Sequence, residues 1–272
     1  MDLEELFRKI GDFSKETHGS SNYDKEELFV MGSSEQEFAP LKYLAKNLPE
    51  LQGQNDLIKR GFVCDSFDLY SITHFQEWYE KQFSKKLVRN VSKRIVVIYL
   101  PDNKSILEAI EAANKGYEVF RDQHILLNGK NLPVQLGEWY AKCTLGLRQV
   151  KSTSQRGFDF ELDGKRIEVK VHWNDQSSPK GVKIKKSLVE LSDYCVIVYL
   201  AQNLMIREIC FLDSEFVLRK FADKGHTIFL KDNDISMYFF SKSNKHQDKI
   251  INSNALLKYA TPTLAMKLAE RF

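Results

Sequence analysis

The segment RGFDFELDGKRIEVKVHW, residues 156–173, holds the side chains with the clearest potential for chemistry. Its Asp163-Gly164 dipeptide strongly favours a two-residue type I′ turn between antiparallel strands. A turn of this kind fixes the register of the hairpin, and the register predicts Asp159 directly opposite Glu168. The two carboxylates are therefore expected side by side, where the repulsion between their like charges is destabilising.

Side chains alternate between the two faces along each strand of such a hairpin. One predicted face is apolar and suited to a core, and it comprises Phe158, Phe160, Leu162, Ile167, Val169 and Val171. The other face is charged, with Glu161 and Arg166 expected as an ion pair near the turn. The carboxylates of Asp159 and Glu168 lie further along this face, and either a shared cation or a raised pKa must relieve their repulsion.

A shared Mg²⁺ ion suits this pair, because carboxylates, waters and phosphate oxygens are its usual ligands. Lys170 projects from the same side as Glu168, where an ammonium group can orient a water and offset charge developing on a phosphate. The alternative is a surface hairpin with a mixed charged face. The pairing of the acids favours a magnesium site for phosphodiester hydrolysis.

The run GFDFELDGKRIEVKV resembles the core motif of the PD-(D/E)xK nuclease superfamily, the fold of many type II restriction endonucleases. The resemblance implies one or two Mg²⁺ ions and catalytic roles for Asp159, Glu168 and Lys170. It also implies the metal ligands Asp159, Glu168 and Val169. The family's proline before the first acid is replaced here by Phe158.

Many members of the superfamily also carry a glutamate on the helix that precedes the hairpin. Pro133 suits the first turn of a helix running to about Leu147, and LPVQLGEWYAKCTLG offers Glu138 for that catalytic role. The alternative is a solvent-facing Glu138 paired with Lys142 at i+4. After the hairpin, the apolar run DYCVIVYL matches the strand that continues the family's sheet.

Basic residues after the hairpin are candidates for nucleic-acid binding through phosphate contacts. The group comprises His172, Lys180, Lys183, Lys185 and Lys186. A solvated lysine face and a histidine at the rim of the sheet are the structural alternatives. The stretch KKLVRNVSKR, residues 85–94, is a second candidate with the same alternative.

The charge balance and the local patterns place a boundary near residue 92. Residues 1–92 hold 12 basic and 16 acidic side chains and are expected to be mainly helical, serving DNA recognition or dimer contacts. Residues 93–272 hold 28 basic and 21 acidic side chains and are expected to form the nuclease core. The core is predicted to begin with a strand at IVVIYL, a helix from Ser105 to Asn114 ended by Gly116, and a strand at 117–120.

Further strands are expected at 157–162, 166–172, 194–200, 205–211, 227–231 and 236–240, and helices at 3–10, 73–83, 214–224 and from Thr261. The fold class is α/β, a restriction-endonuclease-like core with a mixed central sheet flanked by helices. No apolar run approaches the length of a membrane span, and a cytoplasmic protein is expected. The cysteines Cys64, Cys143, Cys195 and Cys210 lack CxxC spacing and are expected to be buried thiols.

The sequence therefore predicts a Mg²⁺-dependent endonuclease of double-stranded DNA, a type II restriction endonuclease acting as a homodimer. One alternative is another nuclease of the superfamily, such as a junction resolvase, a repair enzyme or an RNA-cutting defence nuclease. Another is a non-catalytic nucleic-acid-binding module with the same fold.

Overall fold

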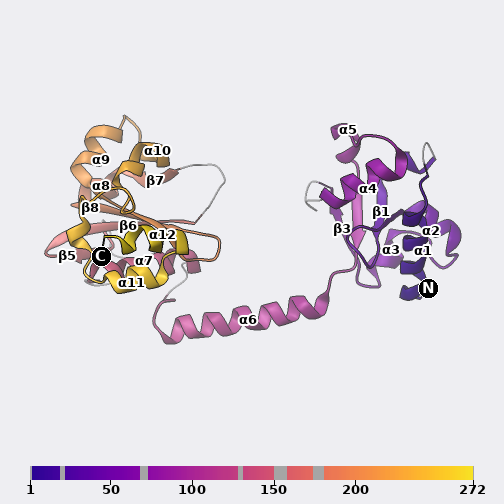
Figure 1. Cartoon of the computed structure of the whole chain (residues 1–272), viewed down its shortest axis with the longest axis horizontal. Coiled ribbons are helices and arrows are strands. Elements are labelled where there is room, and N and C mark those ends of the chain that lie inside the picture. Colours follow the sequence, from indigo (N-terminus) through magenta and orange to yellow (C-terminus); the bar gives the residue numbers. More distant parts are fainter. Residues whose placement is uncertain are drawn as a thin grey trace. The chain divides into compact units, whose positions relative to one another are not determined.

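The structure, a computed structural model, describes residues 2–18, 22–67, 73–127, 131–149, 158–173 and 181–271. The chain divides into two compact units, residues 1–111 and 112–272 (Figure 1). The division falls within helix α6 (Asn103–Asp122). Among the residues described, no helix has both the length and the apolar character required to cross a lipid bilayer.

The first unit is built on a four-stranded mixed sheet with the strand order β2-β1-β4-β3. Strand β1 (Leu28–Met31) pairs in parallel with β4 (Val96–Tyr99), while β2 (Phe38–Pro40) and β3 (Val63–Ser66) are antiparallel to their neighbours. The other elements are α1 (Leu3–Lys15), η1 (Asn22–Lys25), α2 (Leu41–Asn47), α3 (Gln54–Ile58), α4 (Thr73–Phe83) and α5 (Arg89–Ser92). An aromatic core that includes Phe29, Phe38, Phe75 and Phe83 holds them together.

This sheet corrects two predictions. The boundary expected near residue 92 is wrong, because β4 joins β1 to β3 and so belongs to the first unit. The first unit has more helical than strand residues, as predicted, but its core is organised around a four-stranded sheet that the prediction for residues 1–92 lacked. The pairing of β1 with β4 joins segments more than 60 residues apart, and such distant pairing leaves no trace in local periodicity.

The second unit contains a mixed sheet with the strand order β5-β6-β8-β9. Strand β5 (Phe160–Leu162) is antiparallel to β6 (Lys165–Trp173), β6 is parallel to β8 (Tyr194–Leu200), and β8 is antiparallel to β9 (Ile206–Asp213). Strand β8 is buried along nearly its whole length, as expected for an apolar run at the centre of a sheet. The predicted mixed α/β sheet is confirmed for this part of the chain.

Helices and a ribbon cover the two faces of this sheet (Figure 1). One face packs against α7 (Leu132–Leu145), α11 (Ser253–Tyr259) and α12 (Pro262–Ala269). The other face packs against α8 (Lys186–Leu191), α9 (Ser214–Phe221), α10 (Asp232–Ile235) and a ribbon of β7 (Gly181–Lys185) with β10 (Thr227–Lys231). The short 3-10 turns η2 (Ser236–Tyr238) and η3 (Gln247–Lys249) lie between α10 and α11.

Local patterns predict several of these elements with the observed bounds, namely α4, β8 and β10, and Thr261 caps α12 by accepting the main-chain N–H of Leu264. Two predicted strands are wrong. Residues 117–120 are part of α6, which runs through Gly116, and Asp102 rather than Ser105 accepts the main-chain N–H at its start. Residues 236–240 form η2 and a turn, with a single bridge between Phe239 and Cys210.

Gly137 sets how closely α7 approaches the sheet. A Cβ atom at this position would come 2.5 Å from Cγ2 of Val171 on β6. Val171 is β-branched and has little freedom to move aside. We expect Gly137→Ala to lower the free energy of unfolding by about 1–2 kcal/mol, measured by urea denaturation, because overpacking outweighs the gain in helix propensity.

Two further variants make this prediction specific. Gly116→Ala in α6 is the matched control, because nothing lies within 4 Å of its Cβ position, and it should be neutral or stabilising. In a Val171→Ala background, Gly137→Ala should cost much less, because only the Cβ atom of residue 171 then remains close, at 3.1 Å. A Gly137→Ala protein as stable as the wild type would contradict the close contact.

Candidate active site

The β5–β6 hairpin closes with the turn that the sequence predicts. Asp163 and Gly164 both have positive φ values, 49° and 75°, as a type I′ turn requires. The register pairs Phe160 with Ile167, Glu161 with Arg166 and Leu162 with Lys165. These three predicted pairs are confirmed.

Asp159 lies immediately before β5, where the chain leaves the regular ladder. Its main-chain N–H donates to the carbonyl oxygen of Ile167 at 3.0 Å, and its carboxylate Oδ2 accepts the main-chain N–H of Val169 at 2.9 Å. The N–H of Val169 is therefore bonded to the Asp159 side chain. This bond orients the Asp159 carboxylate toward β6.

Glu168 is 2% exposed, and its carboxylate forms an ion pair with the ammonium group of Lys170. Burial raises the pKa of Glu168 to about 7. Part of this net rise in pKa comes from the charge and a side-chain hydrogen bond of the neighbouring Asp159 carboxylate, while Lys170 opposes the rise. The structure thus brings Asp159, Glu168 and Lys170 together, as the register predicts.

The buried strand β8 is the neighbour of β6 in the sheet and lies beside this site. Glu168 is the register partner of Cys195, and Lys170 is the partner of Ile197. The Cys195 thiol is fully buried, and burial raises its pKa to about 11, with the Glu168 charge acting in the same direction. Sequence reasoning placed Cys195 in a strand but missed its position beside Glu168, because that position depends on the register between β6 and β8.

The ion pairs around the hairpin differ from the prediction. Glu161 pairs with Arg148 at 3.0 Å, and Arg166 pairs with Asp193 at 3.3 Å. The predicted Glu161–Arg166 ion pair is therefore wrong. Asp193 also accepts the main-chain N–H of Arg166 at 2.7 Å, and this bond lowers the pKa of Asp193. Sequence reasoning missed Asp193, which ties the start of β6 to the start of β8.

Glu138 is half-buried on α7, the helix that packs on the face opposite Glu168 and Lys170. Among the described parts of the chain, no three His, Cys, Asp or Glu side chains are grouped to hold a metal ion. The structure therefore does not join Glu138 to the two hairpin acids in a three-ligand group. Its catalytic role stays a prediction.

The predicted nucleic-acid-binding residues are spread over three elements. His172 continues the Lys170 face of β6 and contacts the ring of Tyr199 edge to face, with centroids 5.4 Å apart. Lys183 and Lys185 are exposed on β7, while Lys186 is half-buried at the start of α8. Lys180 lies outside the described residues.

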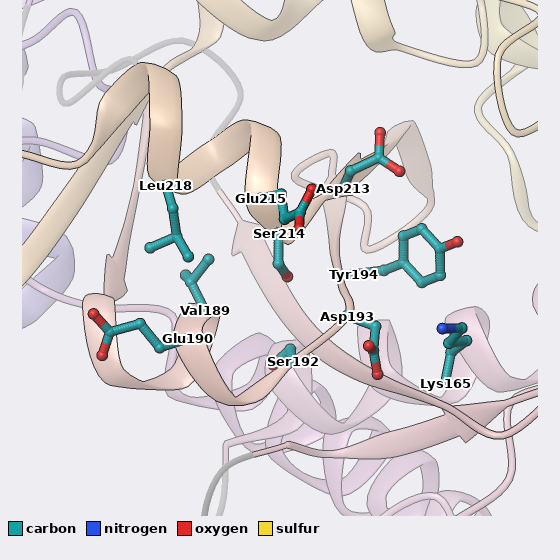
Figure 2. A pocket seen from close by; sticks show the side chains of 10 residues that line it. All are labelled: Lys165, Val189, Glu190, Ser192, Asp193, Tyr194, Asp213, Ser214, Glu215 and Leu218. Atoms are coloured by element: carbon teal, nitrogen blue, oxygen red, sulfur yellow. The ribbon is translucent and has the colours of Figure 1, made fainter.

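A pocket of about 340 Å³ opens beside the start of β8 (Figure 2). Its lining includes Asp193, Asp213 and Lys165, but not Asp159, Glu168 or Lys170. Asp193 is engaged by Arg166, and Asp213 pairs with Lys245 at 2.6 Å and lies 3.4 Å from His246. Two of the acidic residues that line this pocket therefore form ion pairs or hydrogen bonds that link different elements of the fold.

The hairpin donors fit a divalent cation. Two adjacent carboxylates, one of them buried and with a raised pKa, form an oxygen-rich group whose repulsion a bound cation relieves. The main chain of Val169 lies between Glu168 and Lys170, while its side chain is in the core. The two carboxylates would be the donors to such a cation, and Lys170 places a positive charge beside them.

A scan against protein-family models gives no match to this chain, and a search of curated proteins gives none either. The function must therefore be inferred from the geometry of the hairpin and its surroundings.

Proposed function

We propose that the second unit is a Mg²⁺-dependent nuclease core of the PD-(D/E)xK type. The observation that carries this proposal is the buried Glu168 carboxylate beside Asp159, with the Lys170 ammonium group on the same face. A purely structural hairpin gains nothing from burying one acid next to another. Such perturbed carboxylates gather at functional sites.

In this proposal Asp159 and Glu168 hold one Mg²⁺ ion, with the main chain of Val169 beside them. The bound ion supplies Lewis-acid polarisation of the phosphate and a lowered pKa of the attacking water. The hydrogen bond from the Val169 N–H holds the Asp159 carboxylate in place before the ion arrives. Lys170 shares its charge between Glu168 and the phosphate, where it offsets the negative charge that develops during hydrolysis.

The order of elements also supports this family of folds. Helix α7 precedes the β5–β6 hairpin, and β6 pairs in parallel with the buried strand β8. We therefore propose a restriction-endonuclease-like core with double-stranded DNA as substrate. A two-fold homodimer would let two such sites address both strands.

The test is cleavage of plasmid DNA by the purified chain. We expect cutting with Mg²⁺ and none with EDTA, and Asp159→Asn should lower the rate at least about a hundredfold, because one metal donor loses its charge. The rate is measured as loss of supercoiled plasmid on gels. Asp163→Asn is the matched control, since asparagine preserves the hairpin turn and removes a nearby acid outside the site.

Cutting by Asp159→Asn at the wild-type rate would exclude the site. DNA binding by the wild type with no Mg²⁺-dependent cutting would point instead to the non-catalytic binding module. Discrete fragments would support a restriction endonuclease, and a preference for branched DNA would support a junction resolvase.

A further inference from the structure

The outer face of the β7–β10 ribbon is a basic surface around one aromatic ring. We define the ribbon surface as Gly181, Lys183, Lys185, Thr227, Phe229 and Lys231. Along both strands the alternating residues Val182, Ile184, Ile228 and Leu230 are buried against the sheet. The ribbon surface therefore faces away from the core, and it belongs to the same unit as the hairpin acids.

Phe229 leans across the ribbon over Gly181. A Cβ atom on Gly181 would lie 2.9 Å from the ring tip Cζ of Phe229 and 2.4 Å from the carbonyl oxygen of Leu230. The glycine therefore leaves the space that the ring occupies. Phe229 remains half-buried, with part of its ring accessible.

Three lysines surround this ring. Lys183 is the register partner of Phe229, and Lys231 and Lys185 are exposed on the same face. None of the three forms an ion pair with an acid in the described part of the chain. The acid that follows the ribbon, Asp232, accepts a hydrogen bond from the Tyr199 hydroxyl at 3.1 Å.

We propose that the ribbon surface binds unpaired nucleotides, with a base stacked on Phe229 and phosphates held by Lys183, Lys185 and Lys231. This inference rests on the proposed nuclease function and adds to its double-stranded substrate a separate subsite for a single-stranded segment. Aromatic rings stack on any base, and cations beside them track the backbone. In a duplex the base faces are covered by their neighbours, so an unpaired segment fits the surface and an intact duplex does not.

The test measures binding without cleavage. Fluorescence anisotropy in EDTA would compare a labelled single-stranded DNA 12-mer with the matching duplex, and we expect tighter binding of the single strand. Phe229→Leu should weaken single-strand binding about tenfold, while Phe229→Tyr should keep it, because stacking needs the ring. Phe229→Trp should add a fluorescence signal that the single strand quenches.

The lysines are tested by their salt dependence. Lys183→Gln with Lys231→Gln should weaken single-strand binding and reduce the slope of log K against log salt by about 0.7 for each lysine. The matched control changes two exposed lysines on the opposite side of the sheet, Lys258→Gln with Lys267→Gln, and should leave the slope unchanged. Thermal melting verifies that each variant is folded.

Equal single-strand affinity of Phe229→Leu and the wild type would overturn the proposal. Equal losses in the Leu and Tyr variants would also overturn it, because tyrosine keeps a ring on which a base can stack. The test of the proposed nuclease function is separate from the test of this inference. A wild type that stacks single strands on Phe229 but cuts no DNA with Mg²⁺ would leave this inference standing.

Discussion

Lys170→Met should slow plasmid cleavage about a thousandfold at saturating Mg²⁺. Methionine preserves most of the length of the side chain but removes the charge that pairs with Glu168 and that, in the proposed function, offsets the charge of the phosphate. Loss of one preorganised group that stabilises charge in a transition state costs about a hundred- to a thousandfold in rate. The measurement is single-turnover cleavage across a Mg²⁺ titration.

The titration separates two effects of this substitution. Without Lys170 the Glu168 carboxylate loses the neighbour that lowers its pKa, so Mg²⁺ binding should weaken as well. A rate restored fully by excess Mg²⁺ would contradict a direct role of Lys170 in the chemical step. Lys165→Met, an exposed lysine at the turn of the same hairpin, is the control and should cut at the wild-type rate.

Glu168→Gln should abolish cleavage and at the same time stabilise the metal-free protein at pH 8. The pKa of Glu168 is raised from 4.5 to about 7, chiefly by burial, so the folded chain holds this proton more tightly than the unfolded chain. Below pH 4.5 the group is neutral in both states and costs nothing. Between pH 4.5 and 7 only the unfolded chain releases the proton, so the free energy of unfolding falls, and above pH 7 the full penalty is present.

This pKa difference predicts a gain of roughly 3 kcal/mol for Glu168→Gln at pH 8 and almost none near pH 4. Urea denaturation in EDTA at the two pH values measures it. Mg²⁺ should raise the melting temperature of the wild type and leave Glu168→Gln unchanged, because a ligand stabilises only the fold that binds it.

Glu161→Gln is the control on the same hairpin. It removes a partly exposed ion pair with Arg148, and such pairs contribute under about 1 kcal/mol. A wild type whose free energy of unfolding does not fall between pH 4.5 and 8 would show that the fold does not disfavour the charged form of Glu168.

Short-range signals predict the core of the candidate site well. The Asp163-Gly164 turn and the alternation of side chains were sufficient to predict the register from the Phe160–Ile167 pair to the Leu162–Lys165 pair. The same local logic gives the bounds of β8 and β10. These elements are predictable because the residues that determine them lie within a few positions of one another.

The features that sequence reasoning missed depend on distant neighbours. Glu161 finds Arg148 and Arg166 finds Asp193, although each has an opposite charge directly across the hairpin. The strand predicted at residues 117–120 is helical because α6 continues through Gly116. Lys231 and Phe229 join Lys183 only through the pairing of β7 with β10, which are separated by 41 residues between Lys185 and Thr227.

The two-residue turn at Asp163 and Gly164 restricts how the length of this hairpin can vary. One residue inserted between Asp159 and the turn would shift the register of the first strand by one position. Side chains of that strand beyond the insertion would then point to the other face of the hairpin. Asp159 would then point into the core while Glu168 stayed where it is. With the same type of turn, additions must come in steps of two, one residue on each strand, so a chain that keeps both acids together keeps an even number of residues between them.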